Sequence, residues 1–177
     1  MTVRAGHGGR AVVLALGSNL GDRRDILQGG VDAIAGLPEV RLIAVSPVYE
    51  TVPVGGPPQP DYLNAVVLAE TTLPSRELLG RLHEIEAAFD RVRVIRWGPR
   101  TLDIDVITVS GERSDDPELT LPHPRAHERA FVLAPWHDID PAAELPGRGP
   151  VAELLAGVDA SGIRRNGAPL VTPGAES

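Results

Sequence analysis

The order of its apolar segments predicts that this chain adopts an α+β fold of the ferredoxin-like βαββαβ type, an antiparallel sheet with helices packed on it and C-terminal additions. Two segments with helical spacing alternate with short apolar runs, in the order strand, helix, strand, strand, helix, strand. The 177 residues suffice for one domain with a substantial core, and 42% of them are hydrophobic. The sequence contains no internal repeat that would indicate another architecture.

Four short runs rich in valine, leucine and isoleucine are predicted to be strands, because turn residues bound them. The first run ends at Gly17-Ser18-Asn19 and the last at Ser110-Gly111, both typical turn sequences. The predicted strands are residues 11–16, 41–45, 62–70 and 102–109.

Two segments have the periodicity of amphipathic helices. In residues 22–34 the side chains of Leu27, Val31 and Ile34 share one face, and Gly36 with Pro38 is expected to end the helix. In the second segment Pro74 and Ser75 are typical of a helix start. Its apolar stripe consists of Leu78, Leu82, Ile85 and Phe89.

The remaining segments are predicted to be loops or small elements. Five prolines and two glycines in residues 47–60 predict an irregular loop. Residues 114–124 are polar and interrupted by proline, residues 127–134 are expected to form a short helix or a turn, and residues 151–158 a small helix. Beyond Ser161 few residues are candidates for the core, so this end is expected to fray.

Composition excludes several kinds of chemistry. There is no cysteine, which excludes disulfides and thiolate catalysis, and all 17 basic residues are arginine, which excludes a phosphate-binding or Schiff-base lysine. The net charge of −7 argues against nucleic acid as a partner. Residues 1–10 resemble neither a signal peptide nor a membrane anchor, so we expect a cytoplasmic protein without membrane contact.

The most informative segment is Arg91–Val106, RVRVIRWGPRTLDIDV, which places four arginines before Asp103 and Asp105. A guanidinium group binds phosphate oxygens through a planar fork, and Mg²⁺ usually shares its ligand shell between carboxylates, water and substrate phosphates. Aspartates beside Ile104 and Val106 are costly to bury unless a cation compensates them. The segment therefore predicts polyphosphate binding with metal-assisted chemistry. Its arginines are Arg91, Arg93, Arg96 and Arg100.

Two further segments contain residues suited to ligand binding. Tyr62 and Asn64 can stack on and hydrogen-bond a flat heterocycle, although a turn followed by ordinary strand packing fits equally well. His123 and His127 have the spacing of a helical zinc pair, but Pro124 disfavours a helix there. A single histidine that hydrogen-bonds a phosphate or transfers a proton fits better.

The Arg91–Val106 segment also has ordinary explanations. An Asp-x-Asp pair is compatible with a turn cap and an ion pair, an arginine run with a solvated loop, and Trp97 with simple packing. Two alternative functions follow: a module that binds RNA or a nucleotide without catalysis, and a metal-dependent phosphohydrolase.

Taken in order, five segments resemble the 6-hydroxymethyl-7,8-dihydropterin pyrophosphokinase family of folate synthesis. They are LALGSNLGDR, SPVYET, QPDYLNAVV, RWGPRTLDIDV and LPHPRAHERAFVLAP, and the similarity extends from about Val12 to Pro146. The resemblance implies transfer of the terminal diphosphate of ATP to the hydroxymethyl oxygen of the pterin, with release of AMP. Two Mg²⁺ ions would be bound by Asp103 and Asp105, and Arg91 with Arg100 would stabilise the transferred phosphates.

The resemblance also assigns binding residues. Tyr62 and Phe131 would enclose the pterin ring, Asn64 would bind its polar edge, and a mobile arginine loop would close over the site. The residues assigned to the pterin are Thr51, Val52, Val54, Tyr62, Asn64, Trp97 and Phe131. The residues assigned to ATP are Glu86, Arg93, Arg96, Trp97, Val106, Thr120, His123 and Arg129.

The chain departs from the family it resembles at two points. Only Val94 and Ile95 separate Arg93 from Arg96, where some members have a longer loop with a lysine. Pro124 stands where other members have an aromatic residue. Both concern contacts to the nucleotide. We expect a flexible segment at residues 1–10, the pyrophosphokinase domain at 11–150, and a partly disordered C-terminal extension at 151–177. Because no long apolar stripe remains, we expect a monomer.

Overall fold

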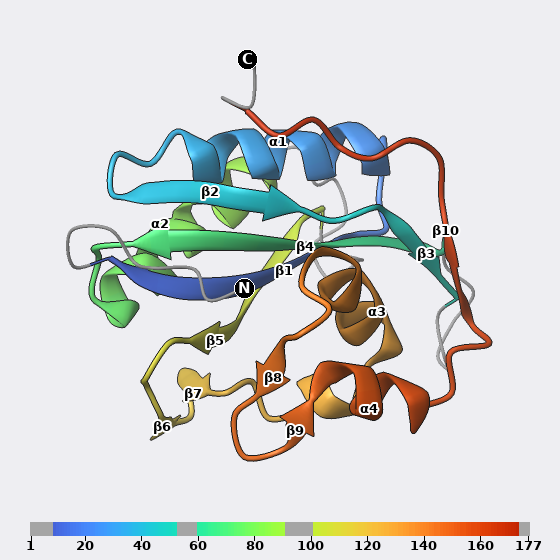
Figure 1. The fold of residues 1–177 in the computed structure, drawn as a ribbon. Helices are drawn as coiled ribbons and strands as arrows, with labels where there is room; N and C mark the ends of the chain where they lie inside the picture. Colours follow the sequence, from blue (N-terminus) through green and yellow to red (C-terminus); the bar gives the residue numbers. More distant parts are fainter. Residues whose placement is uncertain (1–8, 53–59, 91–100, 174–177) are drawn as a thin grey trace.

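The computed structural model describes residues 9–52, 60–90 and 101–173, and it is built around a six-stranded sheet. The strand order is β10-β3-β4-β1-β5, with β2 also paired to β4, and every pairing is antiparallel (Figure 1). Without β3 and β10, the order β2-β4-β1-β5 is that of the predicted βαββαβ arrangement. The strands are β1 Arg10–Ser18, β2 Val40–Val45, β3 Tyr49–Thr51, β4 Tyr62–Thr71, β5 Asp103–Val109 and β10 Ile163–Arg165.

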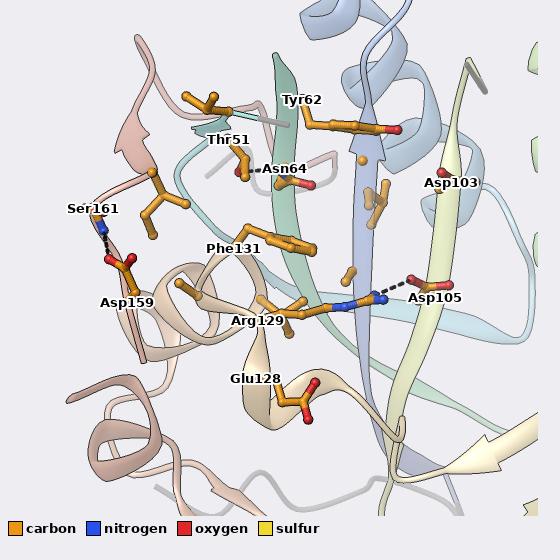
Figure 2. Close-up of a pocket in the computed structure, with 18 residues that line it drawn as sticks. Thr51, Tyr62, Asn64, Asp103, Asp105, Glu128, Arg129, Phe131, Asp159 and Ser161 are labelled. Atoms are coloured by element: carbon orange, nitrogen blue, oxygen red, sulfur yellow. Dashed lines mark hydrogen bonds and ion pairs between the residues drawn. The ribbon is translucent and has the colours of Figure 1, made fainter. Parts of the chain in front are cut away.

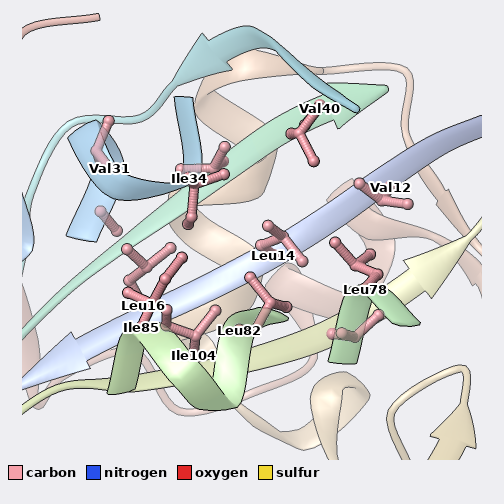
Figure 3. Packing of buried hydrophobic residues seen from close by; sticks show 14 of the residues in the cluster. Val12, Leu14, Leu16, Val31, Ile34, Val40, Leu78, Leu82, Ile85 and Ile104 are labelled. Atoms are coloured by element: carbon pink, nitrogen blue, oxygen red, sulfur yellow. The ribbon is translucent and has the colours of Figure 1, made fainter. Parts of the chain in front are cut away.

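Helices α1 (Arg23–Ala35) and α2 (Ser75–Asp90) cover one face of the sheet, as predicted. Asp22 caps α1, because its carboxylate accepts a hydrogen bond from the backbone N–H of Asp25 at 3.3 Å. Figure 3 shows the apolar stripes of both helices meeting side chains of β1. The fully buried members of the two stripes are Leu27, Val31, Ile34, Leu78 and Leu82.

The other face of the sheet is covered by a second helical layer, which the sequence only partly indicated (Figure 1). Its helices are α3 (Ala130–Ile139) and α4 (Val151–Ala156), and a 3-10 turn, η2 (Ala126–Glu128), precedes α3. The expected short helix or turn at residues 127–134 is therefore a longer helix after a tight turn. The small helix predicted near residue 151 is confirmed.

Strand alternation divides the core between the two helical layers. Leu14 and Leu16 of β1 pack with α1 and α2, whereas Val13 packs with α3. On β4, Val67 points to the first layer and Val66 to the second. Because both faces are covered, the central strands read as continuous apolar runs.

Two predicted irregular segments contain strands. The prediction of an irregular loop at residues 47–60 is wrong for Tyr49–Thr51. These residues form β3, which pairs with β4 near its start. The polar segment 114–124 contains a hairpin of β6 (Ser114–Asp116) and β7 (Leu119–Leu121). β3, β6 and β7 have three residues each, too few for an alternating pattern to be recognised. A third small pair consists of β8 (Glu144–Leu145) and β9 (Gly149–Pro150).

The fraying expected beyond Ser161 does not occur at residues 163–165, which form β10 on the free edge of β3. Farther along, Leu170 is 7% exposed and belongs to the core below α1. The side chain of Gln28 on α1 exchanges two hydrogen bonds with the backbone of Val171, at 2.8 and 2.9 Å. Long-range pairing of this kind leaves no periodic signal in a short segment.

Among the residues described, no helix has both the length and the apolar character required to cross a bilayer.

Candidate active site

Asp103 and Asp105 lie on the face of β5 that points away from α1 and α2. Their neighbours Ile104 and Val106 are buried in the core below those helices. Since residues two positions apart on a strand share a face, both carboxylates point to the side of α3 (Figure 2). Pairing with β1 places Asp103 opposite Gly17 and Asp105 opposite Ala15.

A cavity of about 670 Å³ lies beside these carboxylates. Its walls come from β1, β3, β4, β5, the start of α3 and the segment before β10. In Figure 2, Asn64 lies between the rings of Tyr62 and Phe131. The cavity therefore combines flat aromatic surfaces, a carboxamide and two acids. The residues predicted for the pterin that line it are Thr51, Val52, Tyr62, Asn64 and Phe131.

The Asn64 carboxamide has a defined orientation, because its Nδ2 donates to the Thr51 hydroxyl at 2.7 Å. The backbone of Gly17 approaches from β1: a Cβ atom at this position would lie 3.0 Å from Asn64 Oδ1. Only glycine leaves the carboxamide this close to the neighbouring strand. Asn64 is 7% exposed, so its remaining hydrogen-bonding capacity lies in a largely dry environment.

Arg129 connects the aromatic part of the cavity to the acidic part. Its guanidinium carbon lies 5.6 Å from the centroid of the Phe131 ring, and its Nη1 lies 3.9 Å from Asp105 Oδ2. On the opposite side, burial and the charge of Asp103 raise the pKa of Tyr62, so this phenol stays neutral. A neutral ring and a cation thus flank the two carboxylates.

A second cavity, of about 290 Å³, lies between α2, β5 and the β6–β7 hairpin. The predicted ATP residues that line it are Glu86, Val106, Thr120 and His123. The Glu86 carboxylate accepts the N–H of Ile104 at 2.8 Å, and the Thr120 hydroxyl donates to the carbonyl of Asp116 at 2.9 Å. Glu86 and Thr120 therefore also stabilise the walls of this cavity.

His123 lies at the edge of the small cavity, where its backbone N–H donates to the carbonyl of Ile107 at 2.8 Å. Burial lowers the pKa of the imidazole, and Arg129 and Arg125 lower it further, whereas Asp105 raises it. Neutral imidazole is favoured, and its Nδ1 accepts the Arg125 N–H at 3.2 Å. The residue can therefore donate a hydrogen bond through Nε2.

Asp103 and Asp105 line both cavities, and in the part of the chain described they alone do so. Ligands in the two cavities would thus meet at the same pair of carboxylates. Arg129, predicted to bind ATP, lines the large cavity but reaches the shared pair through Asp105.

Some predicted site residues lie outside the described residues: Val54, Arg91, Arg93, Arg96, Trp97 and Arg100. Other wall residues were missed by sequence reasoning. The sequence pattern places Gly17 in a turn and His83 in a helix, and predicts fraying near the C-terminus, yet all three regions contribute to cavity walls. Only the tight approach of Gly17 had a signal, since glycine at a strand end often marks a close contact. The tail residues in the large cavity are Asp159, Ser161, Gly162 and Ile163.

Comparison with known proteins shows the family of this chain. Residues 13–141 match the 7,8-dihydro-6-hydroxymethylpterin-pyrophosphokinase (HPPK) family. A 2-amino-4-hydroxy-6-hydroxymethyldihydropteridine pyrophosphokinase of Pseudomonas aeruginosa is 44% identical over 154 residues, 87% of this chain and 95% of the relative. The protein of the same name from Methylorubrum extorquens is 45% identical over 152 residues, 86% of this chain and 96% of the relative.

Solved structures support the fold. The HPPK-DHPS crystal structure of wild-type Plasmodium falciparum protein with STZ-DHP aligns with a TM-score of 0.63 at 14% identity, and covers 84% of this chain. This chain spans 43% of that solved chain, so the likeness concerns less than half of it.

The fold is that of an α+β protein whose two cavities share a pair of aspartates, and the family match makes it a transferase. The chain belongs to the 7,8-dihydro-6-hydroxymethylpterin-pyrophosphokinase family.

Proposed function

We propose that the large cavity binds 6-hydroxymethyl-7,8-dihydropterin and the small cavity binds ATP, so that the family reaction takes place at Asp103 and Asp105. In that reaction the pterin hydroxymethyl oxygen attacks the β-phosphorus of ATP. The bond from this phosphorus to the oxygen shared with the α-phosphorus breaks, AMP leaves, and the hydroxyl proton passes to solvent. The products are the pterin diphosphate and AMP.

One observation carries this proposal: the two carboxylates line both cavities. A site for one substrate needs a single cavity, whereas direct transfer needs two cavities that open onto the same acids. The larger cavity has the flat aromatic walls and the carboxamide that suit a pterin. The smaller one has the neutral His123 and borders the shared pair, which suits a nucleotide phosphate chain.

Asp103 and Asp105 are suitable ligands for Mg²⁺ at this site. Both present carboxylate oxygens on one face of a rigid strand, and the Asp105 side chain is 49% exposed, which leaves room for water and phosphate. We propose two ions, which Asp103 and Asp105 would hold. When bound, Mg²⁺ supplies the charge that offsets the phosphates and makes the hydroxyl more acidic.

The chain's own residues would orient the substrates. Asn64, held by Thr51, would bind the polar edge of the pterin between Tyr62 and Phe131. Arg129 would add positive charge beside Asp105. The transfer roles of Arg91 and Arg100, the loop roles of Arg93, Arg96 and Trp97, and the contact of Val54 stay predictions.

A product assay tests the function. With ATP, Mg²⁺ and the hydroxymethyl pterin we expect AMP, formed only when the pterin is present. A phosphohydrolase would release phosphate without the pterin, and a binding module would form no product. Either result would refute the proposal.

The Asp105→Ala variant tests the site. We expect turnover to fall by about 10³-fold or more, because the variant lacks half of the shared carboxylate pair. The fold should persist, since Asp105 is exposed, and circular dichroism would verify this. Asp115→Ala is the matched control, as Asp115 is an exposed aspartate of the β6–β7 hairpin. Near-normal turnover of Asp105→Ala with Mg²⁺ would refute the metal assignment.

Two broader expectations belong to this proposal. We propose a cytoplasmic enzyme, where ATP and reduced pterins are available, and a monomer. Light scattering coupled to size exclusion would report the mass of one chain, 18.8 kDa.

A further inference from the structure

The C-terminal segment forms the outer wall of the large cavity. Asp159, Ser161, Gly162 and Ile163 line it, and the Asp159 carboxylate accepts the N–H of Ser161 at 2.9 Å (Figure 2). The carbonyl of Gly162 accepts the N–H of Val52 at 3.1 Å, which extends the pairing of β10 with β3. The tail therefore touches the same cavity as the residues proposed for the pterin.

Tyr49, Asp138 and Arg165 form a polar cluster that holds this wall in place, here called the C-terminal clamp. The Tyr49 hydroxyl donates to Asp138 Oδ2 at 2.5 Å, and Arg165 Nη2 donates to Asp138 Oδ1 at 2.8 Å. Arg165 Nε donates to the Tyr49 oxygen at 3.2 Å. Three elements that are distant in sequence, β3, α3 and β10, are thus joined through three side chains.

The Tyr49 hydroxyl stays protonated within the clamp. Tyr49 is 8% exposed, and burial together with Asp138 raises the pKa of its hydroxyl, which remains a donor. The Asp138 side chain is 16% exposed, so its bond to Tyr49 is partly shielded from water, whereas its bond to Arg165 is exposed.

A second set of contacts fixes the register of β10 from the adjacent position of β3. Glu50 accepts a hydrogen bond from Asn166 Nδ2 at 2.7 Å and forms an ion pair with Arg164 at 3.3 Å. Arg24 of α1 then donates to the carbonyl of Ala168 at 2.5 Å. Tyr49 and Glu50 are therefore both held by the tail.

Thr51, the next residue of β3, is a wall residue of the cavity and orients Asn64. β3 has only three residues, paired to β4 on one edge and to β10 on the other. Strands this short depend on their neighbours for order. The positions of Thr51 and the Asn64 carboxamide thus depend on the clamp.

We infer that the C-terminal clamp positions Thr51, Val52 and Asn64 for the pterin, so that the tail determines pterin affinity without affecting the nucleotide. This inference rests on the proposed function. Tyr49, Asp138 and Arg165 line neither cavity, so they act through β3 as positioning residues. No clamp residue belongs to the elements around the small cavity.

Steady-state kinetics of Arg165→Met, with each substrate varied in turn, test the inference. Loss of two hydrogen bonds to charged or buried partners should raise KM for the pterin by about tenfold. KM for ATP and kcat should stay within about twofold, because the small cavity and the aspartates are unchanged.

Arg41→Met is the matched control. Arg41 also lies on an edge strand and pairs with a carboxylate, that of Glu70, and its side chain is 68% exposed against 63% for Arg165. It lines neither cavity, so both KM values should remain those of the wild type.

Two further variants separate positioning from simple loss of stability. Tyr49→Phe keeps the buried ring but removes the hydroxyl, and should reproduce the selective rise in the pterin KM. Arg165→Lys retains the charge and should recover part of the affinity. Unchanged pterin KM in both Arg165→Met and Tyr49→Phe, or an equal rise for both substrates, would overturn the inference. Absence of AMP formation by the wild type would instead refute the proposed function.

Discussion

At the residue scale, the site depends on side chains that the strands bring together by alternation. Asp103 and Asp105 share one face of β5, while Ile104 and Val106 secure the strand in the core on the other. The carboxylates are therefore held by a rigid element, as suits groups that line two cavities at once.

Tyr62→Ala should weaken pterin binding more than ATP binding. Tyr62 lines the large cavity but not the small one, and loss of one stacked ring typically costs about 1–3 kcal/mol. Calorimetry with each substrate separately would measure both affinities. A larger loss for ATP would contradict the division of the site.

Gly17→Ala should also weaken pterin binding. The new Cβ would lie 3.0 Å from Asn64 Oδ1 and force the carboxamide to move. Calorimetry with the pterin would report the change, which we expect to be several-fold, on the order of 1 kcal/mol.

Gly80→Ala is the control for this substitution. Gly80 is exposed in α2, and no atom lies within 4 Å of its added Cβ. Helix propensity predicts a gain of about 0.5–1 kcal/mol in the free energy of unfolding, with unchanged pterin affinity. Unchanged pterin affinity in Gly17→Ala as well would show that Asn64 need not be held closely.

At the element scale, Ser46 joins β2 and β3 along one edge of β4. Its hydroxyl accepts the N–H of Val66 and donates to the carbonyl of Pro47, both at 2.8 Å. Its own N–H donates to the carbonyl of Val66 at 2.9 Å. The side chain thus bridges the gap between two strands and sets where β3, and with it Thr51, begins.

Ser46→Ala should lower the free energy of unfolding by about 1–3 kcal/mol, because the buried Val66 N–H loses its acceptor. Chemical denaturation would measure this. Ser110→Ala, at an exposed turn position, should change stability by less than about 0.5 kcal/mol. Equal effects of the two substitutions would exclude this role of Ser46.

Much of the architecture could be predicted at this scale. The helices at Leu27–Ile34 and Leu78–Phe89 were predicted from periodicity, and their faces are confirmed. The sequence pattern did not predict β3, the β6–β7 hairpin or β10. Each of these strands has three residues, and strands this short are stabilised by their neighbours rather than by a local pattern.

At the scale of the whole molecule, one sheet separates two cores, and the site opens where β5, β4 and α3 approach one another. The second core includes Leu133 of α3 and Val151 of α4. The predicted boundary near residue 150 thus falls between elements that share this core, and β10 extends the same sheet. We expect the described parts to unfold together.

Leu82→Ala and Leu133→Ala test this expectation from opposite faces. Both leucines are fully buried, so each substitution should cost about 2–5 kcal/mol. Thermal unfolding followed by circular dichroism should show one cooperative transition in both variants, at a lower temperature than in the wild type. Two separate transitions in either variant would indicate independent units.

By itself, the sequence determined the types of the main elements and the functional groups that Asp103, Asp105, Tyr62 and Asn64 offer, because periodicity and functional groups are local properties of a chain. Only the tertiary structure decided which residues meet. Two contacts join segments that are far apart in the chain: Gly17 lies against Asn64, and Ile163 pairs with Thr51. Such contacts depend on how the whole sheet closes, and no short segment encodes them.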